Sequence, residues 1–134
     1  MKRIFEARTA AFYMSFISCL AALVGILALI VMDKGDITFS WITVALIGAG
    51  VLCGLLNAIT DLGFWPLFTA LGLGCGFSWH LYQGLPTLSD QWNGVNFIGG
   101  NPQAVIIFGA LFGCCTLLSL ISSFLPQRKN IQVQ

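Results

Sequence analysis

Charged residues divide the chain into long uncharged stretches. Two of these run from Arg8 to Asp33 and from Asp36 to Asp61. Each holds about 24 residues, slightly more than the roughly 20 that cross the hydrocarbon core of a bilayer. Asp90 divides the remaining chain, and one apolar stretch of similar length fits on either side of it. Because a charge at mid-bilayer costs several kcal/mol, the pattern leaves the charges to loops and tails. The predicted membrane-spanning helices cover residues 10–32, 41–60, 64–82 and 103–125.

The composition agrees with this pattern. Hydrophobic residues make up 57% of the 134 residues and charged residues only 8%, against roughly a quarter in a typical soluble domain. A soluble protein of this size cannot hide so much apolar surface, because small domains bury a modest fraction of their area. We therefore expect an all-α integral membrane protein, a compact bundle of four transmembrane helices that forms a single domain over residues 1–134 in contact with the lipid bilayer. The net charge of +1 offers no basic field for nucleic acid, so no nucleic-acid partner is expected.

The distribution of lysine and arginine predicts the orientation. The loop after the first predicted helix carries only Lys34, whereas the two tails carry Lys2, Arg3, Arg8, Arg128 and Lys129. The positive-inside rule places both the N and the C terminus in the cytoplasm, and a plasma or inner cell membrane is the expected location. Residues 33–36 and a longer loop over residues 83–102 then lie outside. The first apolar stretch is longer than the roughly 7–15 residues of a signal-peptide core, so we expect an uncleaved first helix.

Small and polar residues recur at spacings of three and four along every predicted helix, which places them on one face of each. The second helix shows this most regularly, with Thr43, Gly50, Gly54 and Asn57 in one series. Lipid gives helices no hydrophobic reason to associate, so close packing over small residues and interhelical hydrogen bonds must hold them together. The residues expected to pack helix against helix are Gly25, Gly50, Gly54, Gly72, Gly76, Gly109 and Gly113.

These glycine stripes are compatible with three arrangements. They hold together a monomeric bundle, they form the interface of a homo-oligomer, or they dock the chain against a larger membrane protein. Gly48, Ala70 and Gly74 lie off the main stripes, so the second and third helices carry small residues on more than one face. This favours contacts beyond the bundle.

Cap residues mark the starts of the predicted helices. Ser40 can cap the second helix, and Thr60 or Asp61 can cap the third, where an acidic side chain also meets the positive end of the helix dipole. Asn101 precedes Pro102 at the start of the fourth helix, where the missing N–H of proline costs little.

His80 is the only histidine and lies about one turn from the outer end of the third predicted helix. A lone histidine near an interface is most often a snorkelling or hydrogen-bonded side chain. A proton-sensing or ligand-binding role needs a partner, and Asp33, Asp36 and Asp90 lie on the same side of the membrane. Asn57 lies nearer the inner end, where we expect it to bond to a neighbouring helix.

The five cysteines lie inside predicted helices, at positions 19, 53, 75, 114 and 115. None lies in an outside loop, where an oxidising compartment could form a structural disulfide, so we interpret them as small packing residues. Cys114 and Cys115 point about 100° apart on a helix and cannot both bind one metal ion with ordinary geometry. No cluster of histidine, cysteine and carboxylate has ligand spacing, and no phosphate-binding loop is present. The sequence therefore predicts no catalytic, cofactor-binding or metal-binding residues.

The outside loop over residues 83–102 is long for a connection between helices. It carries the apolar residues Trp92, Val95, Phe97 and Ile98 among turn-forming residues. These side chains either dip into the lipid headgroups, fold over the mouth of the bundle or contact a partner. The candidate polar or partner contacts of the chain are accordingly Asn57, His80, Trp92 and Phe97.

The absence of a carboxylate from the predicted spans limits the possible functions of the chain. Proton-coupled carriers place a carboxylate within a span, and no predicted span of this chain has one. The sequence favours a small non-enzymatic multi-pass membrane protein, a self-associating or accessory subunit of a membrane transport complex, whose partner is a second copy or a larger membrane protein. The alternative is a homo-oligomeric channel or an uncoupled transporter of small solutes, because a ring of copies lined by glycine, serine and threonine could enclose a pore.

Overall fold

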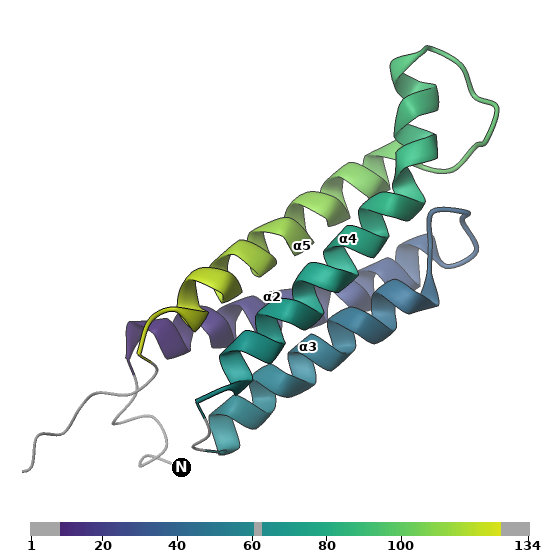
Figure 1. Cartoon of the computed structure of the whole chain (residues 1–134). Coiled ribbons are helices and arrows are strands. Elements are labelled where there is room, and N and C mark those ends of the chain that lie inside the picture. The colour runs from purple at the N-terminus through teal and green to yellow at the C-terminus, as the bar shows by residue number, and fades with distance from the viewer. Residues whose placement is uncertain (1–8, 61–62, 127–134) are drawn as a thin grey trace, which may run out of the picture.

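The computed structural model describes residues 9–60 and 63–126, and this part of the chain is almost entirely helical (Figure 1). The helices are α2 (Ala10–Asp33), α3 (Trp41–Ile59), α4 (Trp65–Trp92) and α5 (Pro102–Ser123). The basic residues of both tails, on which the expected orientation depends, lie outside the described residues. Asp61, which was expected with Thr60 as a possible cap of the third helix, lies outside them too.

Three of the described helices are long and apolar enough to cross a membrane, namely α2, α3 and α5. The shortest of them, α3, has 19 residues and is therefore about 28 Å long, close to the roughly 30 Å of hydrocarbon in a bilayer. These helices indicate a membrane protein. α4 is the longest of the four at 28 residues, but it is less apolar than the other three.

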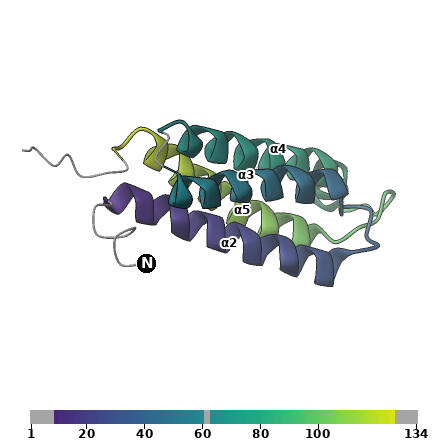
Figure 2. The same cartoon turned by 90° about the horizontal axis from the view of Figure 1, so that it is seen from below.

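The helices form an antiparallel bundle in which α3 and α5 lie between α2 and α4 and pack against both (Figure 2). Both ends of the described chain lie at the same end of this bundle (Figure 1). There the Thr9 hydroxyl donates to the carbonyl of Pro126, and Ser122 Oγ donates to the carbonyl of Ala11 over 2.7 Å. We call this end the tail end, and the opposite end, where Asp33 ends α2, the loop end.

Apolar side chains from all four helices fill the centre of the bundle. The largest of them that are fully buried are Phe12, Leu29, Ile47, Leu73 and Phe112. On α5 the interior positions are Phe108, Phe112, Cys115, Ser119 and Ser122. Gly109, which is also buried, and Gly113 face Leu81 and Phe77 of α4, so the glycine spacing of α5 marks its contact with α4.

Glycines bring α3 and α4 into backbone contact. A methyl group added to Gly72 would stand 2.5 Å from Cα of Gly50, and one added to Gly50 would stand 2.9 Å from the backbone nitrogen of Leu73. Real Cβ atoms do not approach other atoms so closely, so only glycine fits at either position. Such close approach is how small residues increase packing between helices in lipid.

The remaining glycines expected to pack are also at helix contacts. Gly76 lies against Ile47 of α3, Gly54 lies against Cys19 of α2, and Gly25 lies against Leu111 and Phe112 of α5. The packing of α2 on both α3 and α5 therefore depends on glycine as well.

The expected capping residues are confirmed at two of the three helix starts. Ser40 Oγ accepts from the N–H of Ile42 over 3.2 Å, and Asn101 Oδ1 accepts from the N–H of Gln103 over 3.1 Å. At α4 the expected cap by Thr60 is wrong. The capping position is Phe64, which makes no side-chain cap bond. Thr60 instead ends α3, where both its Oγ1 and its backbone N–H donate to the carbonyl of Leu56.

α4 continues through residues 83–92, which were expected to belong to the outside loop. Gly84 and Pro86 both disfavour helix interiors, and the expected span stopped before them. The helix persists because Gly84 packs closely against Val105 of α5, and Figure 1 shows its last turns bending away from the bundle, as proline-containing helices do. The connection to α5 therefore begins only at Asn93.

Candidate functional site

His80 is buried between α4 and α5 near the loop end, with 1% of its surface exposed. Its Nε2 lies 3.3 Å from the carbonyl oxygen of Val105, and because a carbonyl can only accept, Nε2 carries the proton. The ring also meets Phe112 edge-on, with 5.7 Å between the ring centroids. His80 is therefore a buried, hydrogen-bonded residue, and its side chain does not extend toward the membrane interface.

Asp33 is a buried carboxylate at the loop end. It is 5% exposed, and it accepts a hydrogen bond from Thr38 Oγ1 over 2.9 Å. Asp36 accepts from the backbone N–H of Thr38 over 3.4 Å. Asp90 accepts hydrogen bonds from the loop before α5. The end of α2 and the turn that follows it therefore contain buried polar groups. We call the buried polar residues at the loop end, Asp33, Thr38, His80 and Thr87, the polar layer.

The loop before α5 closes this polar layer. Thr87 Oγ1 donates to the carbonyl of Gly99 over 3.0 Å, and Gly100 follows with a φ of +90°. A methyl group added to Gly100 would stand 2.8 Å from Thr87 Oγ1 and 3.0 Å from Thr38 Cγ2. Within this layer Thr38 bonds to Asp33 of α2, Thr87 joins α4 to the loop, and His80 joins α4 to α5.

The thiols and Asn57 do not form a reactive cluster. Cys19 and Cys115 are buried and Cys75 and Cys114 are exposed, all as free thiols. Among the described residues no three histidine, cysteine or acidic side chains are grouped so that they could hold a metal ion. Asn57 is buried, at 3% exposure, near the tail end of α3.

Trp92 and Phe97 are the most exposed aromatic residues of the described chain, at 91% and 86%. The backbone that carries Phe97 is fixed, because Asp90 Oδ2 accepts from the N–H of Phe97 over 3.0 Å and from the N–H of Ile98 over 2.7 Å. Neither aromatic side chain folds over the mouth of the bundle. The loop is therefore held against the end of α4, and both Trp92 at the end of that helix and Phe97 in the loop are exposed.

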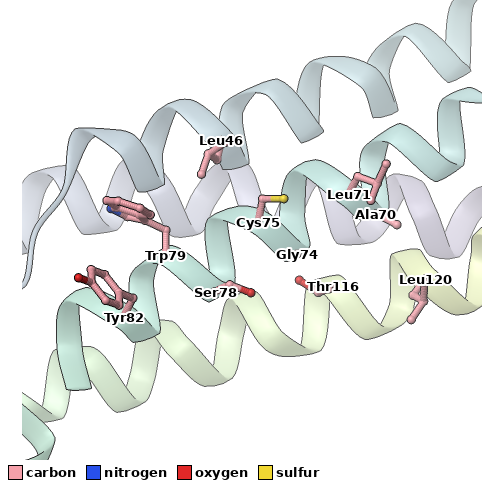
Figure 3. A pocket seen from close by; sticks show the side chains of 10 residues that line it. All are labelled: Leu46, Ala70, Leu71, Gly74, Cys75, Ser78, Trp79, Tyr82, Thr116 and Leu120. Atoms are coloured by element: carbon pink, nitrogen blue, oxygen red, sulfur yellow. The ribbon is translucent and has the colours of Figure 1, made fainter.

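A groove of about 840 Å³ runs along the outward face of α4. Its walls come from Leu46 of α3 on one side and Thr116 and Leu120 of α5 on the other (Figure 3). Its floor is formed by α4 itself, through Ala70, Leu71, Gly74, Cys75, Ser78, Trp79 and Tyr82. Figure 3 shows the hydroxyls of Ser78 and Thr116 turned toward each other across the floor. An apolar groove of this size with a few polar groups has the character of a binding surface.

A second groove, of about 440 Å³, lies over α3 on another face and contains Gly48 and Leu23. The two grooves are where the off-stripe small residues of the sequence lie, with Ala70 and Gly74 in the larger and Gly48 in the smaller. Sequence reasoning did not single out Leu71, Cys75 and Ser78. The off-stripe position of Gly74 was the signal that could have found them.

Comparison of the chain with protein-family models, with curated proteins and with solved structures finds no match.

Proposed function

We propose that the protein is a small non-enzymatic subunit of a membrane assembly, which acts by associating laterally with further copies or with a larger membrane transport protein. The observation that carries this proposal is the groove on α4. The least apolar helix of the bundle has an outward face that is both hollowed and lined by Gly74, Cys75 and Ser78. Small and hydroxyl-bearing residues on a lipid-facing side are what a second helix needs for close approach.

In this proposal all four helices cross a plasma or inner cell membrane, with both tails in the cytoplasm. The position of α4 supports this, because it packs against both α3 and α5 and runs alongside them (Figure 1). The bond between Thr9 and Pro126 at the tail end supports an even number of crossings. The five basic residues of the tails support the cytoplasmic assignment.

A non-enzymatic role is supported by the way the polar side chains are used. His80 and Asp33 are buried in a layer whose bonds join structural elements, and the groove on α4 contains no ionisable side chain apart from Cys75 and Tyr82. The groove is thus suited to packing and offers no evident acid–base pair.

The test is to fill the larger groove without disturbing the bundle. A methyl group added to Gly74 would meet only Thr116 Cγ2, at the ordinary contact distance of 3.5 Å, so Gly74→Leu should extend into the groove. Gly48→Leu is the matched control, because nothing lies within 4 Å of a methyl group there.

After extraction in mild detergent, the Gly74→Leu variant should lose the associated species that migrates with the wild type, while its unfolding midpoint stays unchanged. The Gly48→Leu variant should keep that species. A wild-type protein that migrates as a single chain, or a Gly74→Leu variant that keeps every association, would refute the proposal.

A further inference from the structure

The contact between the antiparallel helices α3 and α4 has a regular register. Three close contacts at glycines define it, and they pair Gly54 with Thr69, Gly50 with Leu73, and Ile47 with Gly76. Each step of three or four residues toward the start of α3 is matched by an equal step toward the end of α4. The next step, four residues beyond Ile47 and Gly76, places Thr43 opposite His80. Both residues lie on the buried faces of their helices, each with 1% of its surface exposed.

The Thr43 hydroxyl lacks a hydrogen-bond partner among the described residues, although its Oγ1 is fully buried. The other buried threonines differ, because Thr38, Thr69 and Thr87 each donate to a carboxylate or carbonyl oxygen. Buried hydroxyls in native proteins bond either to the protein or to an ordered water molecule. Thr43 therefore marks a place inside the bundle where a small polar partner fits.

His80 supplies an acceptor on the facing helix. Its Nε2 donates to the carbonyl of Val105, and its Cδ2 lies 3.9 Å from a methyl group placed on Gly109. Both of these residues belong to α5, so the edge of the ring that holds Nε2 and Cδ2 faces α5. The opposite edge, which holds Nδ1, faces away from α5, and α3 is the other helix that packs closely against α4. In a neutral imidazole whose proton is on Nε2, Nδ1 is an acceptor.

We propose that one ordered water molecule is bound between Thr43 and His80. The water accepts a hydrogen bond from Thr43 Oγ1 and donates one to His80 Nδ1, which gives it the two polar partners that a buried water needs at least. The bridge satisfies the one buried threonine hydroxyl that has no protein partner. It also joins the polar layer to the interior of α3, which the protein bonds of that layer do not reach.

The loop end offers this water a short route from solvent. A pocket of about 230 Å³ lies there, and Thr87, Asp90 and Gly100 are among the residues that line it. Thr87 lies on the same buried face of α4 as His80, two turns or about 10 Å along the helix. The site is thus the innermost part of a polar region that begins at the outer surface, and it is separate from the groove on α4.

The single histidine of the chain makes the site directly observable. Full-length protein with isotopically labelled histidine, purified through a tag without histidine and placed in lipid bilayers, gives one pair of imidazole nitrogen signals. Solid-state NMR then measures the transfer of magnetisation from water to each nitrogen. The wild type should show transfer to Nδ1. Thr43→Ser keeps the hydroxyl and should keep this transfer, whereas Thr43→Val replaces the hydroxyl by a methyl group and should lose it.

Thr69→Val is the matched control, because it removes a buried hydroxyl from the same helix contact whose partner is the carbonyl of Trp65. It should leave both imidazole signals of His80 unchanged. The Nε2 signal, which the bond to Val105 determines, should stay in place in every variant and shows that the site is still folded. Absence of water transfer to Nδ1 in the wild type would overturn the proposal, as would a Thr43→Val variant that retains it. A hydrogen-bonded Nδ1 without water transfer would mean that Thr43 bonds directly to His80.

Discussion

Gly50 of α3 and Gly72 of α4 are in contact through their backbones, with no room between them for a methyl group. This contact sets the distance between the two helices, and it lies on a different face of α4 from the groove. The same helix therefore has a closely packed inner face and an open outer one.

The contact predicts opposite effects of the same substitution at two glycines. Gly→Ala in a helix interior gains roughly 1 kcal/mol from conformational entropy, and Gly48→Ala should show this gain because its surroundings are open. Gly72→Ala should instead lower the free energy of unfolding, because overpacking costs about 1–3 kcal/mol or more. Unfolding in mixed detergent micelles measures both, and equal effects at the two positions would mean that the α3–α4 contact is not tight.

Two buried serines of α5 give a prediction about hydrogen bonding. Ser122 Oγ donates to the carbonyl of Ala11 over 2.7 Å, whereas Ser119 Oγ is buried without a hydrogen-bond partner among the described residues. Ser122→Ala should cost about 0.5–1.5 kcal/mol of stability, and Ser119→Ala should be neutral or stabilising because it removes an unsatisfied hydroxyl. A larger loss for Ser119→Ala than for Ser122→Ala would contradict this account of the tail end.

The orientation can be tested by labelling in a background without the native cysteines. Ile4→Cys and Ile131→Cys should resist an impermeant maleimide on intact cells and react after permeabilisation, because the basic tails are expected in the cytoplasm. Gln91→Cys, at the exposed end of α4, should react on intact cells. Labelling of either tail from outside would reverse the proposed topology or change the number of crossings.

The alternative of a channel or uncoupled transporter makes its own prediction. If the protein is an accessory subunit that associates through the groove on α4, no ring of copies forms and no pore is enclosed. Liposomes that contain the purified protein should then release a trapped small solute at the same rate as liposomes without protein. Release that depends on the amount of protein, and that Gly74→Leu abolishes, would favour the channel.

The positions of the helices follow from the sequence because charges and capping residues mark their ends. The bounds of α2, α3 and α5 lie within two residues of the predicted spans. The end of α4 could not be predicted in this way. Gly84 and Pro86 are locally unfavourable in a helix, and what keeps them helical is a contact with Val105, which is distant in the sequence.

The candidate site was less accessible to sequence reasoning for the same reason. The burial of both Asp33 and His80 depends on how α2 and α4 pack against α5. The groove on α4 depends on which face of that helix α3 and α5 leave uncovered. The periodic pattern shows which residues share a face, but it does not show which of two small-residue faces is buried.

The most direct test of the account is the mass of the protein in a native lipid environment. Native mass spectrometry of membrane nanodiscs that contain the chain should give the 14.5 kDa polypeptide bound to further copies or to a larger membrane protein, and the Gly74→Leu variant should give it alone. A wild-type chain found only as a single copy would contradict the central claim that this protein acts by lateral association.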